Sequence, residues 1–142
     1  MDDRQFVRTY VVTGGDFQGG GRMSTDIKDT LKDLGFPPAL IRRVAIAAYE
    51  AEMNVVMYAR SATVTLRVTP DCIGLEVIDQ GSGIPDVPLA MQEGYSTATA
   101  EMREMGFGAG MGLPNIKRNA DEFVIASEVG RGTDLAIRVR VH

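Results

Sequence analysis

Five runs of β-branched and aromatic residues, each bounded by Gly, Pro or other turn-forming residues, predict β-strands. They cover residues 6–13, 63–69, 72–78, 122–128 and 133–141. Pro70-Asp71 separates the second run from the third, and a glycine-containing turn at residues 130–132 separates the last two. Each of these pairs therefore predicts an antiparallel hairpin.

Apolar residues at three- and four-residue spacing predict helices over residues 22–34, 37–59 and 113–119. The longest of them carries an apolar stripe that predicts a face buried in the core: Leu40, Ile41, Val44, Ala48, Ala51 and Val55. Glu50 and Asn54 are four residues apart and project together on another face of this helix. Glu52 points about 160° away from Asn54, so it falls outside this polar pair.

Length and composition indicate one folded domain covering residues 1–142. Hydrophobic residues make up 44% of the chain and charged residues 24%, which is ordinary for a globular protein. The net charge of −4 argues against a nucleic-acid partner, because such a partner requires a broad basic surface. The chain has no apolar run of about 18 residues and begins with a polar segment, so we expect a cytoplasmic protein without a membrane partner.

The scarcity of cysteine and histidine excludes two kinds of catalytic centre. Cys72 is the one cysteine and His142 the one histidine of the chain. A metal centre of His and Cys ligands and a Ser-His-Asp triad therefore both lack their parts.

Four short motifs occur in a fixed order and in definite structural contexts. A Glu-x-x-x-Asn pair lies on the long helix, an Asp-x-Gly-x-Gly follows a predicted strand, a glycine-rich segment precedes a predicted helix, and a Gly-Thr pair opens a predicted strand. They occupy residues 50–54, 79–83, 106–112 and 132–133. Each motif is weak alone, but their combination is specific.

Together these motifs resemble the GHKL superfamily, which includes gyrase-type, chaperone-type and histidine-kinase ATPases. The small size and the segment at residues 106–112 are most similar to the anti-sigma-factor serine kinases and the stressosome switch kinases. The resemblance extends from about residue 6 to residue 141. It implies the Bergerat ATP-binding fold, an α/β two-layer sandwich in which helices cover one face of a mixed, mostly antiparallel sheet.

The Asp-x-Gly-x-Gly motif and the Gly-Thr pair would hold adenine in such a fold. The Asp79 carboxylate can accept a hydrogen bond from the exocyclic amino group, which guanine does not present at that ring position. Gly81 and Gly83 would allow close approach of the backbone, Ile84 would lie under the base, and the Thr133 hydroxyl would support it directly or through water. Asp79 and the glycines are equally typical of an ordinary turn, and Thr133 of an ordinary strand.

Glu50 and Asn54, the polar pair on the long helix, would provide a general base and a ligand for Mg²⁺. Glu50 resembles the general base of the family, placed to take a proton from an attacking hydroxyl or water. Asn54 offers a neutral oxygen to Mg²⁺, whose other ligands would be water and phosphate oxygens. The alternative is a solvated pair of polar residues one helical turn apart.

The glycine-rich segment would hold the triphosphate through backbone N–H groups at the start of a helix. The residues assigned to it are Gly106, Gly108, Gly110, Met111, Gly112 and Leu113. Neither a P-loop nor a Rossmann motif has this spacing. We expect residues 93–112 to form a mobile lid ordered by nucleotide, although a flexible structural loop is the simpler alternative. The earlier run Gly19-Gly20-Gly21 has the character of an ordinary flexible connection.

The resemblance implies a regulatory serine/threonine-protein kinase that uses ATP and Mg²⁺ to phosphorylate a STAS-type antagonist protein. It also implies a further partner, such as a sigma factor or another regulator, and is compatible with a homodimer. Two alternatives remain. One is an ATP-gated binding module with little turnover, and the other is a histidine-kinase-type catalytic domain that acts in trans.

Overall fold

A computed structural model describes residues 5–81, 87–92 and 112–142 of the chain. Its elements follow the order β1, α1, α2, β2, β3, α3, α5, β4, β5. Their bounds are β1 Phe6–Thr13, α1 Arg22–Asp33, α2 Pro38–Tyr58, β2 Ala59–Val68, β3 Cys72–Gly81, α3 Val87–Ala90, α5 Gly112–Asn119, β4 Glu122–Glu128 and β5 Gly132–Arg140. None of the described helices is long and apolar enough to cross a membrane.

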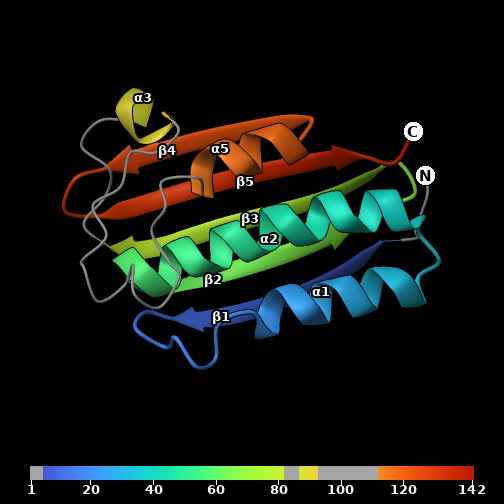
Figure 1. The fold of residues 1–142 in the computed structure, drawn as a ribbon, viewed down its shortest axis with the longest axis horizontal. Coiled ribbons are helices and arrows are strands. Elements are labelled where there is room, and N and C mark those ends of the chain that lie inside the picture. The colour runs from blue at the N-terminus through green and yellow to red at the C-terminus, as the bar shows by residue number, and fades with distance from the viewer. Residues whose placement is uncertain (1–4, 82–86, 93–111) are drawn as a thin grey trace.

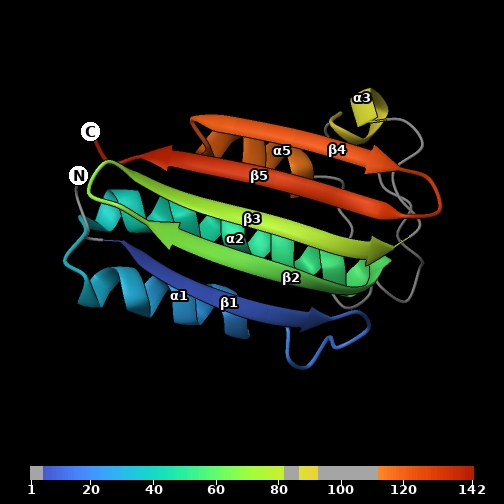
Figure 2. The ribbon, with the colours of Figure 1, turned by 180° about the vertical axis from the view of Figure 1, so that it is seen from behind.

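The five strands form one sheet in the order β1-β2-β3-β5-β4, and every pairing between neighbours is antiparallel. The helices α1, α2 and α5 cover one face of this sheet (Figure 1). None of the helices that the structure describes covers the other face when the molecule is seen from behind (Figure 2). This arrangement confirms the predicted α/β two-layer sandwich with a mostly antiparallel sheet.

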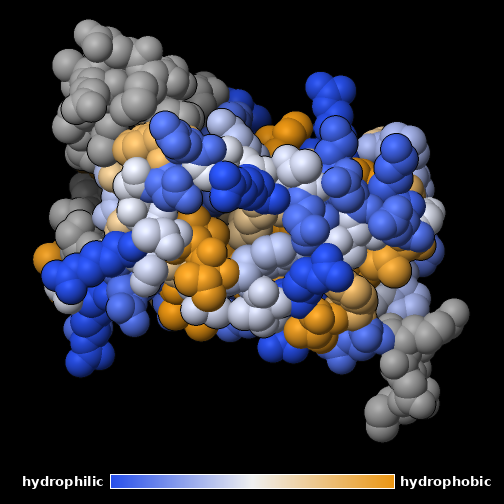
Figure 3. All heavy atoms as spheres, turned by 90° about the horizontal axis from the view of Figure 1, so that it is seen from below, coloured by the Kyte–Doolittle hydropathy of each residue, from blue (hydrophilic) through white to orange (hydrophobic). Residues whose placement is uncertain are grey.

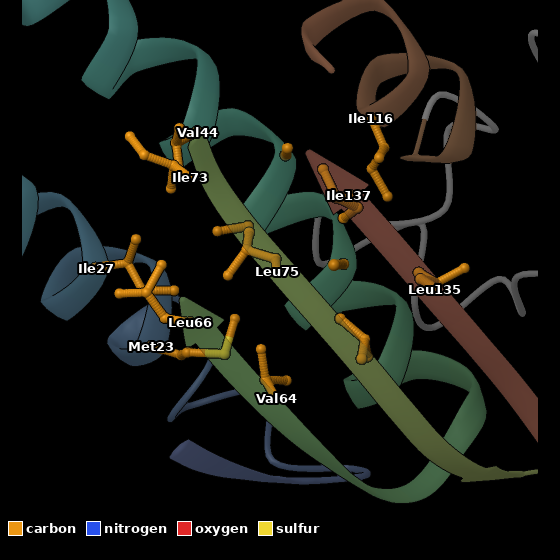
Figure 4. Close-up of a cluster of buried hydrophobic side chains, with 14 of the residues drawn as sticks. Met23, Ile27, Val44, Val64, Leu66, Ile73, Leu75, Ile116, Leu135 and Ile137 are labelled. Carbon is orange, nitrogen blue, oxygen red and sulfur yellow. The ribbon is translucent and has the colours of Figure 1, made fainter. Parts of the chain in front are cut away.

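The core lies between the helices and the covered face of the sheet. Alternate strand residues point into it, which is the pattern that the hydrophobic alternation predicts. Figure 4 shows side chains from α1, α2 and α5 meeting those of β2, β3 and β5. The largest fully buried side chains are Ile27, Leu31, Val44, Val55, Val64, Leu66, Ile73, Val77, Ile116, Leu135, Ile137 and Val139.

Two strands are longer than predicted, and both extend toward the end of the sheet that carries the motifs. β2 begins at Ala59, directly after α2, because its first residues pair with the end of β3. The register of this pairing shifts between Ala59 and Ser61. β3 continues to Gly81, so Asp79 lies within the strand rather than after it. A one-turn helix, α3, lies between β3 and α5 and was not predicted.

A buried carboxylate joins α1 to α2, which the sequence did not predict. Helix α1 begins after Gly21 without a side-chain cap of its own. Glu52, only 3% exposed, accepts hydrogen bonds from the backbone N–H groups of Met23 at 3.1 Å and Ser24 at 3.2 Å. It thereby satisfies two N–H groups that the first turn of a helix leaves without partners and brings negative charge to the positive end of α1.

The glycine run before α1 is closely packed, which corrects its interpretation as an ordinary flexible connection. The N–H of Gly19 donates to the Asp16 carboxylate at 2.9 Å. A Cβ at Gly20 would lie 2.8 Å from the sulfur of Met53, and Gly21 adopts a φ of 97° that favours glycine. Small residues here allow the connection to pack directly against α2.

The edge strand β1 is tied to α1 by polar side chains. Asp26 accepts hydrogen bonds from Tyr10 and, at 3.0 Å, from Arg8, which also donates to Thr30. Burial and the hydrogen bond to Asp26 raise the pKa of Tyr10 to about 12, so its hydroxyl remains a donor at neutral pH.

Figure 3 shows the side of the molecule on which β1 and α1 lie, where apolar side chains form separate patches among charged ones. The charged groups limit the tendency of an edge strand to pair with other chains.

Candidate functional site

The motif residues that the structure describes gather at one end of the fold. Here the C-terminal ends of α2 and β3 lie beside the N-terminal ends of α5 and β5 (Figure 1). The four elements are far apart in sequence, and the antiparallel pairing of β3 with β5 places the end of one beside the start of the other. The described motif residues then form two groups, one on the sheet and one between α2 and α5.

The group on the sheet is centred on Asp79. This residue continues the inward alternation of Ile73, Leu75 and Val77, so its carboxylate faces the helices rather than the open side. Its Oδ1 accepts a hydrogen bond of 2.9 Å from the backbone N–H of Thr133 on β5. Burial raises the pKa of Asp79, and this hydrogen bond opposes part of the rise. One carboxylate oxygen is thus held by the sheet, which fixes the direction of the other.

Glycine is required beside Asp79 for steric reasons. At Gly132, which has a φ of 135°, a Cβ would lie 2.2 Å from the Asp79 carbonyl oxygen and 2.8 Å from Oδ1. At Gly81, a Cβ would lie 3.2 Å from the Cα of Ala59 and 3.3 Å from Oδ1 of Asp79. At Gly132 a side chain would clash with Asp79, and at Gly81 it would crowd Ala59 and the Asp79 carboxylate.

The second group lies where α2 meets α5. Glu50 is half-buried on α2, and Asn54, also half-buried, follows one turn later. A Cβ at Gly112, the first residue of α5, would lie 3.4 Å from Oε2 of Glu50. Burial raises the pKa of Glu50, and a hydrogen bond with the Asn115 side chain opposes part of this rise. A carboxylate with a raised pKa is a better proton acceptor near neutral pH than an exposed one.

These two groups fit a Mg²⁺-nucleotide. Asp79 offers a hydrogen-bond acceptor beside closely packed glycines, and α5 directs its N-terminal N–H groups toward the same end of the fold as Glu50 and Asn54. Among the described residues no group of three or more His, Cys, Asp and Glu could hold a metal ion. A cation here would therefore depend on the Asn54 amide oxygen together with phosphate and water oxygens, as Mg²⁺ commonly does.

Part of the predicted site lies outside the described residues. This part comprises Gly83, Ile84, Gly106, Gly108, Gly110 and Met111, together with most of the expected lid at 93–112. Leu113 is described, and its side chain is buried in the core. Its backbone N–H, rather than its side chain, is the part of Leu113 that can serve a ligand.

Two residues of the site were absent from the sequence prediction. Asn115 contacts Glu50, although nothing in the sequence distinguishes it from the other polar residues of a short amphipathic helix. Ser127 on β4 lies 2.9 Å, oxygen to oxygen, from the hydroxyl of Thr133. The pairing of Ser127 with Thr133 follows from the observed turn at residues 129–131. The predicted turn at residues 130–132 would instead set residue 129 opposite residue 133, so the sequence prediction held no signal for Ser127.

Without nucleotide, we expect the variant E50Q to be more stable than the wild type at pH 7. The fold raises the pKa of Glu50 above its ordinary value of 4.5, so folding favours the protonated form. A carboxyl group whose pKa is raised by folding contributes its full stabilisation below pH 4.5. This contribution is lost as the pH rises through the pKa of the folded state. Glutamine stays neutral, so thermal unfolding should show an advantage on the order of 2 °C at pH 7 that shrinks toward pH 4.5.

The exposed carboxylate of Glu76 on β3 provides the control, because E76Q removes a charge from the open face of the sheet. Its melting temperature should follow that of the wild type across the same pH range. If the melting temperatures of E50Q and the wild type differ by the same amount from pH 4.5 to pH 7.5, the charge on Glu50 does not destabilise the fold.

The fold and the order of the motifs match a class of ATP-binding domain that has no P-loop. The family model described as histidine kinase-, DNA gyrase B- and HSP90-like ATPase matches residues 39–142. The chain belongs to this family, which confirms the resemblance seen in the motifs.

Three named relatives show which kinds of protein this chain is similar to. The chain is 32% identical over 139 residues to a protein named serine/threonine-protein kinase RsbT from Bacillus subtilis, an alignment that covers 95% of both chains. It is 35% identical over 98 residues to an anti-sigma F factor from Caldanaerobacter subterraneus, covering 66% of this chain and 65% of the relative. An anti-sigma F factor from Thermoanaerobacter is 33% identical over 88 residues, covering 62% and 54%.

Proposed function

We propose that this protein is an ATP-dependent serine/threonine-protein kinase that phosphorylates a small STAS-type regulatory protein. The observation that carries the proposal is the position of Glu50, half-buried beside the first residue of α5 and one turn before Asn54. The similarity to a serine/threonine-protein kinase over nearly the whole of both chains supports the same assignment. A second partner, such as a sigma factor or another regulator, would bind the same domain.

In this proposal the residues divide the work between binding and chemistry. Asp79, Gly81 and Thr133, with Gly83 and Ile84, hold the adenine, and the glycine segment with α5 holds the phosphates. Bound Mg·ATP would supply the transferable phosphate and the charge neutralisation that phosphoryl transfer requires. Asn54 contributes an oxygen to the cation, and Glu50 accepts the proton of the attacking hydroxyl.

The test is a transfer assay with purified proteins. The kinase candidate is incubated with Mg²⁺, ATP labelled at the γ-phosphate and each STAS-domain protein of the source organism. We expect label on one of them, stable to acid and located on serine or threonine.

Two other results would overturn the proposal. Tight ATP binding without transfer to any STAS-domain protein would favour the ATP-gated binding module. Acid-labile label would favour histidine as the acceptor and hence a histidine-kinase-type domain acting in trans.

A further inference from the structure

A hydrogen-bonded row crosses three strands on the helix-covered face of the sheet. Asp79 on β3 accepts from the N–H of Thr133 on β5, and the Thr133 hydroxyl lies 2.9 Å from the Ser127 hydroxyl on β4. Thr133 is only 4% exposed, so fixed partners rather than bulk water determine the orientation of its hydroxyl. Ser127 contributes the β4 side chain of this row.

The backbone sets the direction of the bond between the two hydroxyls. Ser127 Oγ is also 3.2 Å from the carbonyl oxygen of Gly132. A carbonyl oxygen can only accept, so the single proton of the Ser127 hydroxyl is directed to Gly132. Ser127 then accepts from Thr133, and the Thr133 proton is committed to Ser127. Hydroxyl rotors are assigned in this way from their partners.

We propose that Ser127 is a specificity-determining residue, which fixes the Thr133 hydroxyl as a hydrogen-bond acceptor toward the nucleotide base. The inference rests on the proposed ATP-binding function. With its proton held by Ser127, Thr133 presents lone pairs to the base, directly or through water, beside the second carboxylate oxygen of Asp79. Two acceptors suit the amino group at position 6 of adenine and disfavour a purine that carries an oxygen there.

Removal of the Ser127 hydroxyl should therefore alter selectivity more than affinity. In S127A the Thr133 hydroxyl is free to rotate, and it can donate to an oxygen at position 6 of a purine. The probe is inosine triphosphate, which carries an oxygen at this position and lacks the 2-amino group of guanine. We expect the preference for ATP over inosine triphosphate to fall about tenfold, with ATP affinity within a few-fold of the wild type.

The measurement is the dissociation constant of each Mg²⁺-nucleotide by calorimetry, so it does not depend on kinase turnover. S127T keeps a hydroxyl at this position and should retain the wild-type preference. The control S61A removes a serine hydroxyl from β2, where the alternation with buried Ala62 places Ser61 on the open face of the sheet. It should also leave the preference unchanged.

The possible outcomes separate the inference from the function on which it rests. An unchanged preference in S127A, or equal weakening of both nucleotides, would show that Ser127 only supports the hairpin. Loss of the preference in S127T as well would also overturn the inference, because the hydroxyl is still present there. A wild-type protein that binds no ATP would overturn the proposed function itself.

Discussion

The variant E50Q should transfer phosphate at least about 10²-fold more slowly than the wild type, while its affinity for Mg·ATP changes by no more than a few-fold. Loss of a general base has this order of effect. Glutamine keeps the size and polarity of the side chain, so the contacts with Asn115 and the start of α5 can persist. What is lost is the ability to accept a proton, which affects the rate of the chemical step rather than nucleotide binding.

Single-turnover transfer and calorimetric ATP binding measure the two quantities separately. N54A is the informative comparison, because it lies one turn further along α2 and should weaken the Mg²⁺-dependent part of binding. If E50Q and N54A instead lose nucleotide binding to the same extent, Glu50 is a structural residue. The stability measurements make the same distinction, since a structural Glu50 would leave E50Q less stable than the wild type at pH 7.

The placement of Glu50 and Asn54 on one helix was predictable because helical periodicity is a local property. The buried face of α2, including Val44, Ala48 and Val55, follows from the same pattern. The sheet was predictable in its strands and hairpins, since each depends on alternation and on a nearby turn. The order of the strands, with β5 between β3 and β4, depends on contacts between distant segments and came from the structure.

Glu52 shows why the remaining parts of the fold were missed. Its position on α2 is among apolar residues, and a charged side chain there gives no local sign of its partner. The partner is the backbone at the start of α1, 28 and 29 residues earlier in the chain. Backbone N–H groups have no signature in the sequence, so a carboxylate that caps a distant helix is recognised only once the two helices are packed.

The sequence motifs predict which residues form the site, but they do not predict the hydrogen bonds between those residues. Asp79 and Thr133 were each assigned to adenine, yet their direct contact depends on the register between β3 and β5. Ser127 joins them through the register between β4 and β5. Motif spacing predicts which residues would serve a ligand, and strand register determines how they orient one another.

We expect D79N to lower ATP affinity about 10²-fold and to abolish most of the preference for ATP over GTP. The carbonyl oxygen of asparagine can still accept from the N–H of Thr133, as Asp79 Oδ1 does. Its NH₂ group then replaces the carboxylate oxygen that faces the base and presents a donor where adenine also presents one. With adenine, a hydrogen bond to a charged group is therefore replaced by two donors that face each other. With guanine, the oxygen of the base gains a hydrogen-bond donor.

The fold should tolerate this change, because burial already disfavours the charge on Asp79. Calorimetry with Mg·ATP and Mg·GTP on D79N and the wild type measures the effect. D134N is the matched control: it removes the neighbouring carboxylate on β5, whose exposed side chain alternates to the open face of the sheet. D134N should keep the wild-type preference. Equal affinity of the wild type for ATP and GTP, or a preference that survives in D79N, would mean that Asp79 does not select the base.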